Sequence, residues 1–304
     1  MAQPQSAILP EGERFAVFLT FTLAEGEAAA HAVRRLAAGL PALTAEMAAA
    51  MAEPALASAI GFGAKVWPRL WSGAMPAELV PFEPLADGAR RAPATPADVF
   101  IHIHSGRHDA NMALARAVAG RLDGAVRPVE EIHGYRHRDG RDLTGFVDGT
   151  ENPKDDERAA AALVGDEDPA FAGGSYVSIQ RYVHDLAAWE RLAVPAQEAV
   201  IGRTKADDVE LDDDAKPADA HIARVVIEED GEELQVVRHS LPYGTATESG
   251  LYFVAYGRSP APFRRMLERM VIRDGAGVHD RLLDFTRAVT GAAFFVPPED
   301  FLRG

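Results

Sequence analysis

Residues 145–153 read Gly-Phe-Val-Asp-Gly-Thr-Glu-Asn-Pro, and this stretch places one acid, Asp148, between two glycines. Glycine permits positive φ angles and lets the backbone approach a ligand closely. The Gly-Thr and Asn-Pro pairs that follow are turn formers, so we expect Asp148 to stand on a tight loop. On residue types alone, an ordinary surface turn is the simpler interpretation.

On both sides of this stretch the chain repeats one order of elements. The expected strands are residues 14–23, 99–104, 174–183 and 250–256. A helical pattern follows each of them, with apolar residues at a spacing of three and four. The repeat predicts an α+β fold of two ferredoxin-like units with antiparallel sheets, residues 1–138 and 139–304.

The composition limits the function. The chain has 304 residues, 47% hydrophobic and 25% charged, which is typical of a globular protein. A net charge of -15 argues against nucleic acid or an anionic membrane as the main partner. The absence of cysteine excludes disulfides, thiolate nucleophiles and Cys-ligated haem or zinc. Residues 1–12 lack a secretion signal and no segment has the length of a membrane span, so we expect a cytoplasmic protein.

Three of the ten histidines have informative surroundings. His221 follows a turn-like segment, residues 216–220, and precedes residues 222–227, which predict a strand. Alone, a histidine at the start of a strand is more often structural than a ligand. His102 and His104 share one strand face. They could bind a metal, but no third ligand is evident nearby, so a polar sheet face is the favoured interpretation.

Three segments together resemble the dye-decolourising peroxidases, a family of haem enzymes. Residues 145–153 resemble the family's GxxDG signature, and His-Ile-Ala-Arg at 221–224 resembles the segment that carries the proximal haem ligand. Residues 236–244 (VVRHSLPYG) resemble the strand with the distal arginine. The resemblance covers nearly the whole chain and is strongest to the bacterial B-type subgroup. It implies the family's dimeric α+β barrel type of fold, with one haem b per chain bound mainly by the C-terminal half.

The resemblance also implies roles for single residues. His221 would be the proximal ligand of the haem iron, and the catalytic residues would be Asp148, Arg238 and Ser240. Since positions i and i+2 of a strand face the same way, Arg238 and Ser240 would both look at the haem while His239 turns away. An iron-bound imidazole needs an acceptor on its other nitrogen, and Asp284 maps onto that acceptor. The alternative for Asp284 is a surface acid paired with a neighbouring arginine.

Four further residues complete the implied haem site. Arg203 would contact a propionate, for which a bidentate guanidinium is suited. Leu251 and Phe253 would supply apolar walls, although such a stripe is part of the core in most proteins. Glu151 would lie near a propionate and help to hold Mn(II).

The implied activity is a peroxidase that reduces hydrogen peroxide and oxidises dyes, phenolic or other aromatic donors and possibly Mn(II). Its one-electron steps would pass through an oxyferryl species. Electrons from bulky dyes could arrive through surface residues such as Tyr135, Tyr182 or Trp189. The expected partners are hydrogen peroxide and a small-molecule or metal-ion reductant. We also expect a homo-oligomer, and no encapsulating nanocompartment because the chain lacks a C-terminal extension.

Two other classes of function remain open at this point. A haem- or porphyrin-handling protein with low turnover would share His221 and Arg203, but it would not need both Asp148 and Arg238. A haem-free α+β binding module, in which His221 is structural, would give no Soret band with added hemin.

Overall fold

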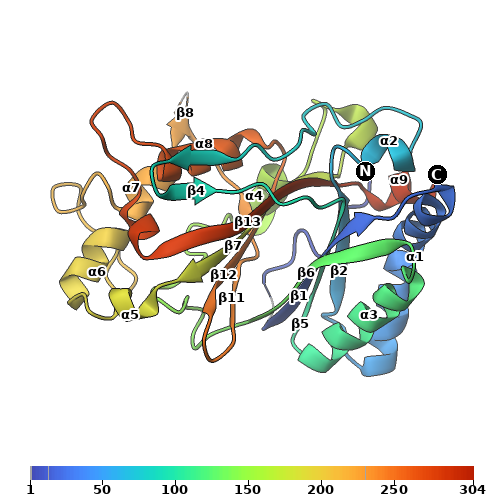
Figure 1. Ribbon diagram of the computed structural model, residues 1–304, viewed down its shortest axis with the longest axis horizontal. Coiled ribbons are helices and arrows are strands. Elements are labelled where there is room, and N and C mark those ends of the chain that lie inside the picture. The colour runs from blue at the N-terminus through green and yellow to red at the C-terminus, as the bar shows by residue number, and fades with distance from the viewer. Residues whose placement is uncertain (1, 13, 230) are drawn as a thin grey trace.

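The computed structural model describes residues 2–12, 14–229 and 231–304 (Figure 1). The strands of the first half are β1 (Phe15–Leu23), β2 (Ala57–Phe62), β3 (Leu85–Asp87), β4 (Arg90–Ala92), β5 (Val99–Ser105) and β6 (Val126–Tyr135). Its helices are α1 (Glu27–Met51), α2 (Trp67–Leu70) and α3 (His108–Arg121). The helices α1 and α3 pack against each other beside these strands (Figure 1).

The second half follows the same scheme with more short elements. Its strands are β7 (Ser175–His184), β8 (Glu228–Glu229), β9 (Glu232–Glu233), β10 (Val237–Arg238), β11 (Leu241–Gly244), β12 (Ser249–Gly257) and β13 (Thr286–Val296). Its helices are α4 (Asp155–Ala162), α5 (Leu186–Trp189), α6 (Val194–Ile201), α7 (His221–Val225), α8 (Ala261–Val271) and α9 (Glu299–Arg303), with 3-10 turns η1 (Pro169–Phe171) and η2 (Arg281–Asp284).

The main sheet has nine strands within the described residues, in the order β10-β12-β7-β13-β2-β5-β1-β6, and β11 also pairs with β12. Its strand pairs are all antiparallel. β10 and β11 both pair with β12 and can be taken as one strand position. In each half, the first and third strands of the main sheet along the chain then lie in the middle, and the second and fourth lie outside. This is the ferredoxin-like order, so the predicted α+β fold is confirmed. The two halves join where Phe295 of β13 pairs with Phe62 of β2.

The helices and the sheet bury apolar faces against each other. On α1, Val33, Leu36, Leu40 and Leu43 recur at helical spacing and are buried. The strands supply the opposite side of this core with β-branched and aromatic residues. A second core cluster contains residues from both halves, among them Phe18 and Tyr252, whose rings stack with centroids 4.5 Å apart.

Some local expectations were wrong. Residues 222–227 do not form a strand, because residues 221–225 form the short helix α7, in which the Arg224 N–H donates to the Ala220 carbonyl. The strands β2, β6 and β13 were not expected. β6 lies at the end of the strand order and carries exposed charged residues, which is typical of an edge strand. Because charged residues interrupt its sequence, β6 does not show the alternation of apolar and polar residues that would predict a strand.

Candidate functional site

A deep cavity lies among the elements of the second half. It encloses about 1060 Å³ of space not filled by atoms, part of it open to solvent. Its wall is formed by β7, β12, α7, α8 and the loop before α4, and all of its lining residues lie between 142 and 286. Leu251 and Phe253 alternate with buried Tyr252 and Val254 along β12, so the first two line this cavity while the others face the core.

His221 stands in the wall of this cavity and is held by a buried acid. Its Nδ1 donates a hydrogen bond to Oδ2 of Asp280 at 2.6 Å, and the Asp280 side chain is 0% exposed. The other oxygen of Asp280 accepts from the Leu282 N–H at 2.9 Å and caps η2. The partner of His221 is therefore Asp280, and the expected assignment to Asp284 is wrong. Asp284 is 49% exposed and contacts His279 at 3.3 Å.

Asp148 also lines the cavity, on the loop that its flanking glycines predict. Gly145 and Gly149 have φ angles of 89° and 88°, and the Asp148 N–H donates to the Gly140 carbonyl at 3.1 Å. Burial raises the pKa of Asp148, and the nearby negative charge of Asp142 raises it further. The positive charge of Arg238 lowers this pKa and opposes both effects. The pKa of Asp148 is thus raised overall, and the positive charge of Arg238 offsets part of the rise.

Arg238 lies on β10, and its Nε is buried without a hydrogen-bond partner in the described part of the chain. Arg238 and Asp148 line both the deep cavity and an adjoining polar cavity. Ser240 and His239 both lie in the wall of the polar cavity, and neither lines the deep cavity. His239 therefore turns away from the deep cavity as expected, whereas Ser240 does not face that cavity beside Arg238. Ser240 Oγ accepts from the Val254 N–H at 3.4 Å.

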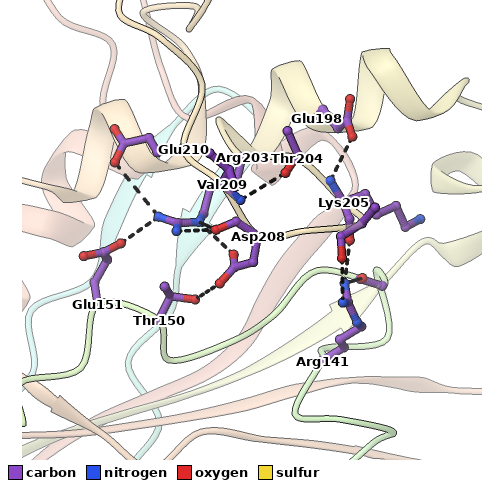
Figure 2. A network of polar contacts seen from close by, with 12 residues as sticks. Arg141, Thr150, Glu151, Glu198, Arg203, Thr204, Lys205, Asp208, Val209 and Glu210 are labelled. Carbon is purple, nitrogen blue, oxygen red and sulfur yellow. Dashed lines mark hydrogen bonds and ion pairs between the residues drawn. The ribbon is translucent and has the colours of Figure 1, made fainter.

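Arg203 belongs to a network of acids beside the GxxDG loop (Figure 2). Its guanidinium contacts Asp208 Oδ1 and Glu151 Oε1, both at 2.7 Å. Asp208 also accepts from the Thr150 hydroxyl at 2.6 Å. Arg203 and Glu151 therefore pair with each other, as Figure 2 shows, and their expected contacts with a propionate stay predictions.

Two polar residues near the site were not expected from the sequence. His184 of β7 lines the deep cavity, with its ring between Asp142 (3.1 Å) and Thr286 (2.7 Å). Asn152 hydrogen-bonds the backbone of Arg238. Neither residue stands in a pattern that would distinguish it from other polar residues, because both contacts join segments far apart in the chain.

His102 and His104 lie on the same face of β5, as expected, and that face is buried. They are 1% and 2% exposed, and they pack with His239 at ring-centroid distances of 5.6 and 5.7 Å. Burial lowers the pKa of His104 to about 4 and that of His239 to about 3. Among the residues that the structure describes, no group of three or more His, Asp or Glu is arranged to hold a metal ion.

Two of the three residues expected at the surface are also buried. Trp189 is 1% exposed, and its indole N–H donates to the Thr144 carbonyl at 2.8 Å. Tyr182 is 7% exposed and lines the deep cavity. Tyr135, at the end of β6, is half-buried. The first two therefore lie too deep to receive electrons directly from a bulky donor.

The deep cavity has the features of a haem site. The Nε2 of His221 forms no hydrogen bond within the described residues, and a neutral imidazole is a good iron ligand. Apolar side chains of β12 and α8 line the walls. Residues 5–136 match the family model described as Dyp-type peroxidase, N-terminal, and residues 139–301 match Dyp-type peroxidase, C-terminal. The chain belongs to the Dyp-type peroxidase family.

Similar proteins cover almost the whole chain. A dye-decolorizing peroxidase of Rhodococcus erythropolis is 44% identical over 99% of this chain and 88% of its own length. The solved structure of DyPB from Rhodococcus jostii has a TM-score of 0.96 and 40% identity, covering 98% of this chain and 97% of that one. The encapsulated DyP-type peroxidase of Mycobacterium smegmatis has a TM-score of 0.95 and 44% identity, covering 100% and 98%.

Family membership establishes the activity and the cofactor. The chain is a Dyp-type peroxidase, an oxidoreductase that acts on peroxide, and haem is its cofactor. One of its structural neighbours is an encapsulated enzyme, so the expectation that a nanocompartment is not a partner lacks support. The described residues contain no helix long and apolar enough to cross a membrane. The homo-oligomer stays a prediction.

Proposed function

We propose that this Dyp-type peroxidase holds its haem through His221 and uses Asp148 and Arg238 as the groups that act on hydrogen peroxide. The observation that supports this most directly is their arrangement. His221, oriented by a buried carboxylate, faces the same cavity as Asp148 and Arg238. A protein that only carries haem has no use for an acid and a cation at this place.

Asp280 fixes the state of the proximal histidine. Because a carboxylate accepts the Nδ1 proton, the proton is absent from Nε2, whose lone pair can bind iron. A carboxylate in this place also holds the imidazole ring in one orientation. Haem, when bound, supplies the iron that receives peroxide and the redox chemistry that follows.

Asp148 and Arg238 have complementary tasks on the peroxide side. The carboxylate of Asp148 accepts the proton of one peroxide oxygen and returns it to the other, which allows water to leave. The guanidinium of Arg238 stabilises the negative charge that develops as the O–O bond breaks. Its buried Nε, which lacks a partner in the described residues, is a donor available for this purpose.

The reducing substrates that we propose are phenolic and other aromatic donors, including dyes, each giving one electron at a time. The deep cavity is walled by side chains of one half of the chain, and a bulky dye would stand outside it. We keep Tyr135 as a candidate for an electron-relay residue, because it is half-buried where the other two candidates are buried.

Mn(II) is a second candidate donor. A variant of the DyPB neighbour is described in complex with manganese, at 40% identity to this chain. Glu151 is 41% exposed and pairs with Arg203. Burial raises the pKa of Glu233, and the negative charge of Glu151 is one of the charges that raise it further. Acids therefore gather at this edge of the site. Glu151→Gln should raise the KM for Mn(II) and leave the KM for a phenolic donor unchanged.

Stopped-flow absorption on the hemin-loaded protein tests the main proposal. We expect peroxide to bleach the Soret band rapidly and a phenolic donor to restore it. His221→Ala should lose haem, while Arg238→Leu and Asp148→Ala should keep haem and slow the peroxide step by roughly 10²–10⁴-fold. Wild-type rates in both distal variants would refute the roles given to them. A Soret band that stays unchanged after peroxide is added would favour a haem-handling protein.

A further inference from the structure

The side chain of Asn152 joins the two segments that carry the distal groups. The Arg238 N–H donates to Oδ1 of Asn152 at 2.9 Å, and Nδ2 of Asn152 donates to the Arg238 carbonyl, also at 2.9 Å. One carboxamide thus satisfies both backbone groups of Arg238. The two partners are 86 residues apart in the chain.

The position of β10 explains why such a partner is needed. Among the described residues, β10 is the outermost strand in its part of the sheet and pairs with β12 alone, where Arg238 stands opposite Ala255. The His239 N–H donates to the Val254 carbonyl, which shows that alternate residues of this segment point their hydrogen bonds toward β12. The backbone groups of Arg238 consequently point away from β12, to the open edge, and the Asn152 amide occupies the place of a neighbouring strand.

Asn152 also contacts Gly149, the residue that follows Asp148. Its own N–H donates to the Gly149 carbonyl at 3.0 Å, directly after Asp148. A Cβ on Gly149 would lie 3.4 Å from Asn152 Nδ2, so the turn packs tightly against the amide. Among the described residues, the two bonds of Asn152 are the hydrogen bonds that connect loop 145–153 with segment 236–240.

We propose that Asn152 is a positioning residue for the peroxide reaction, whose carboxamide sets the spacing between Asp148 and Arg238. The inference rests on the distal roles proposed above. The Arg238 Nε has no hydrogen-bond partner in the described structure, so the placement of this guanidinium depends strongly on its backbone. Only asparagine offers a donor and an acceptor at this length. Aspartate lacks the donor, and alanine lacks both groups.

Hydrogen exchange in the haem-free protein tests the contact without any turnover. In Asn152→Ala, the amide of Arg238 should exchange at least about tenfold faster than in the wild type, because its acceptor is gone. Asn152→Asp keeps an acceptor and should fall between the two. The control is Asn111→Ala, which removes another buried, hydrogen-bonded amide in the first half of the chain. Unchanged Arg238 exchange in Asn152→Ala would overturn the proposed clamp.

Peroxide kinetics on the hemin-loaded protein test the functional consequence. Asn152→Ala should lower the second-order rate constant by about 10–100-fold, since small displacements of catalytic groups have effects of this size. In the Arg238→Leu background, Asn152→Ala should lower this rate constant by less than about twofold, because the guanidinium that Asn152 positions is already absent. Equal losses in both backgrounds would overturn the positioning role. Asn152→Asp, with a partial loss, serves if the alanine variant does not fold.

The two proposals fail in different ways. If Arg238→Leu and Asp148→Ala react at the wild-type rate, the distal roles are wrong, and the positioning role falls with them. If those variants are slow but Asn152→Ala reacts like the wild type, only the inference about Asn152 is refuted. The Soret band of each Asn152 variant should match the wild type, because Asn152 does not line the deep cavity.

Discussion

Replacing Asp280 by asparagine would test the proximal pair sharply, because Asp280 uses both carboxylate oxygens. Oδ2 accepts from His221 at 2.6 Å and Oδ1 accepts from the Leu282 N–H at 2.9 Å. Asparagine has one oxygen and one NH₂ group, so it can keep only one of these bonds. If the oxygen keeps the cap of η2, the NH₂ group meets Nδ1 and forces its proton onto Nε2, which then cannot bind iron.

The expected size of this effect follows from the geometry. A buried hydrogen bond to a charged group contributes about 1.5–3 kcal/mol. Since about 1.4 kcal/mol corresponds to a factor of ten, the affinity for hemin should fall by roughly 10–100-fold. Loss of a residue that orients a metal ligand has consequences of the same order.

The assay is a hemin titration of the haem-free protein followed at the Soret band. Asp284→Asn is the matched control: it removes the same charge four positions away, from a side chain that is 49% exposed. We expect its affinity for hemin to stay within about twofold of the wild type. Wild-type affinity in Asp280→Asn would refute the reasoning, and so would a larger loss in Asp284→Asn.

Three further predictions concern titration. Burial raises the pKa of Asp148 and Arg238 opposes this, so Arg238→Leu should move the acidic limb of the peroxide rate profile to higher pH; stopped flow from pH 3 to 7 would show it. Asp148→Asn should stabilise the haem-free protein at pH 7, because an acid with a raised folded pKa costs stability above that pKa; the advantage in urea unfolding should vanish below pH 3.8, the ordinary pKa. The pKa of His104 is lowered from 6.5 to about 4 in the folded protein. As the pH falls from 6.5 to about 4, the unfolded chain therefore binds a proton at His104 before the folded protein does, and the free energy of unfolding decreases by about 3 kcal/mol. His104→Gln should flatten the fall of unfolding free energy in that range.

The motif residues could be predicted from the sequence because their chemistry is local. Asp148 needs glycines on both sides to stand on its loop, and those glycines are visible as letters. Leu251 and Phe253 follow from strand alternation. The choice between Asp280 and Asp284 could not be made in this way. Asp280 precedes η2 and Asp284 ends it. Only the folded chain decides that Asp280 meets His221: the Arg281 N–H donates to the Asp219 carbonyl and so holds the start of η2 beside the residues before His221.

The missed strands have a different cause. Residues 286–296 mix Thr, Arg, Ala and Gly with two Val and two Phe residues, so neither the period of a helix nor that of a strand stands out. These residues form the strand β13 because they pair with β7 on one side and with β2 on the other. The long-range pairing outweighs the weak local preference, as is common for central strands.

His102 and His104 show how the first half of the chain contributes to a site that the second half builds. Within the part of the chain that the structure describes, the deep cavity is lined by residues between 142 and 286, all of them in the second half. The polar cavity, however, is lined by His102 and His104 of β5 and by Arg136 after β6, together with Asp148 and Arg238. Asp148 and Arg238 thus line two cavities: the deep cavity, whose walls come from the second half, and the polar cavity, to which the first half contributes His102, His104 and Arg136. A protein of the second half alone would retain His221 and its acid but would open the surroundings of Asp148 to water. Because burial is the main cause of the raised pKa of Asp148, the first half is needed to set the proton affinity of the distal acid.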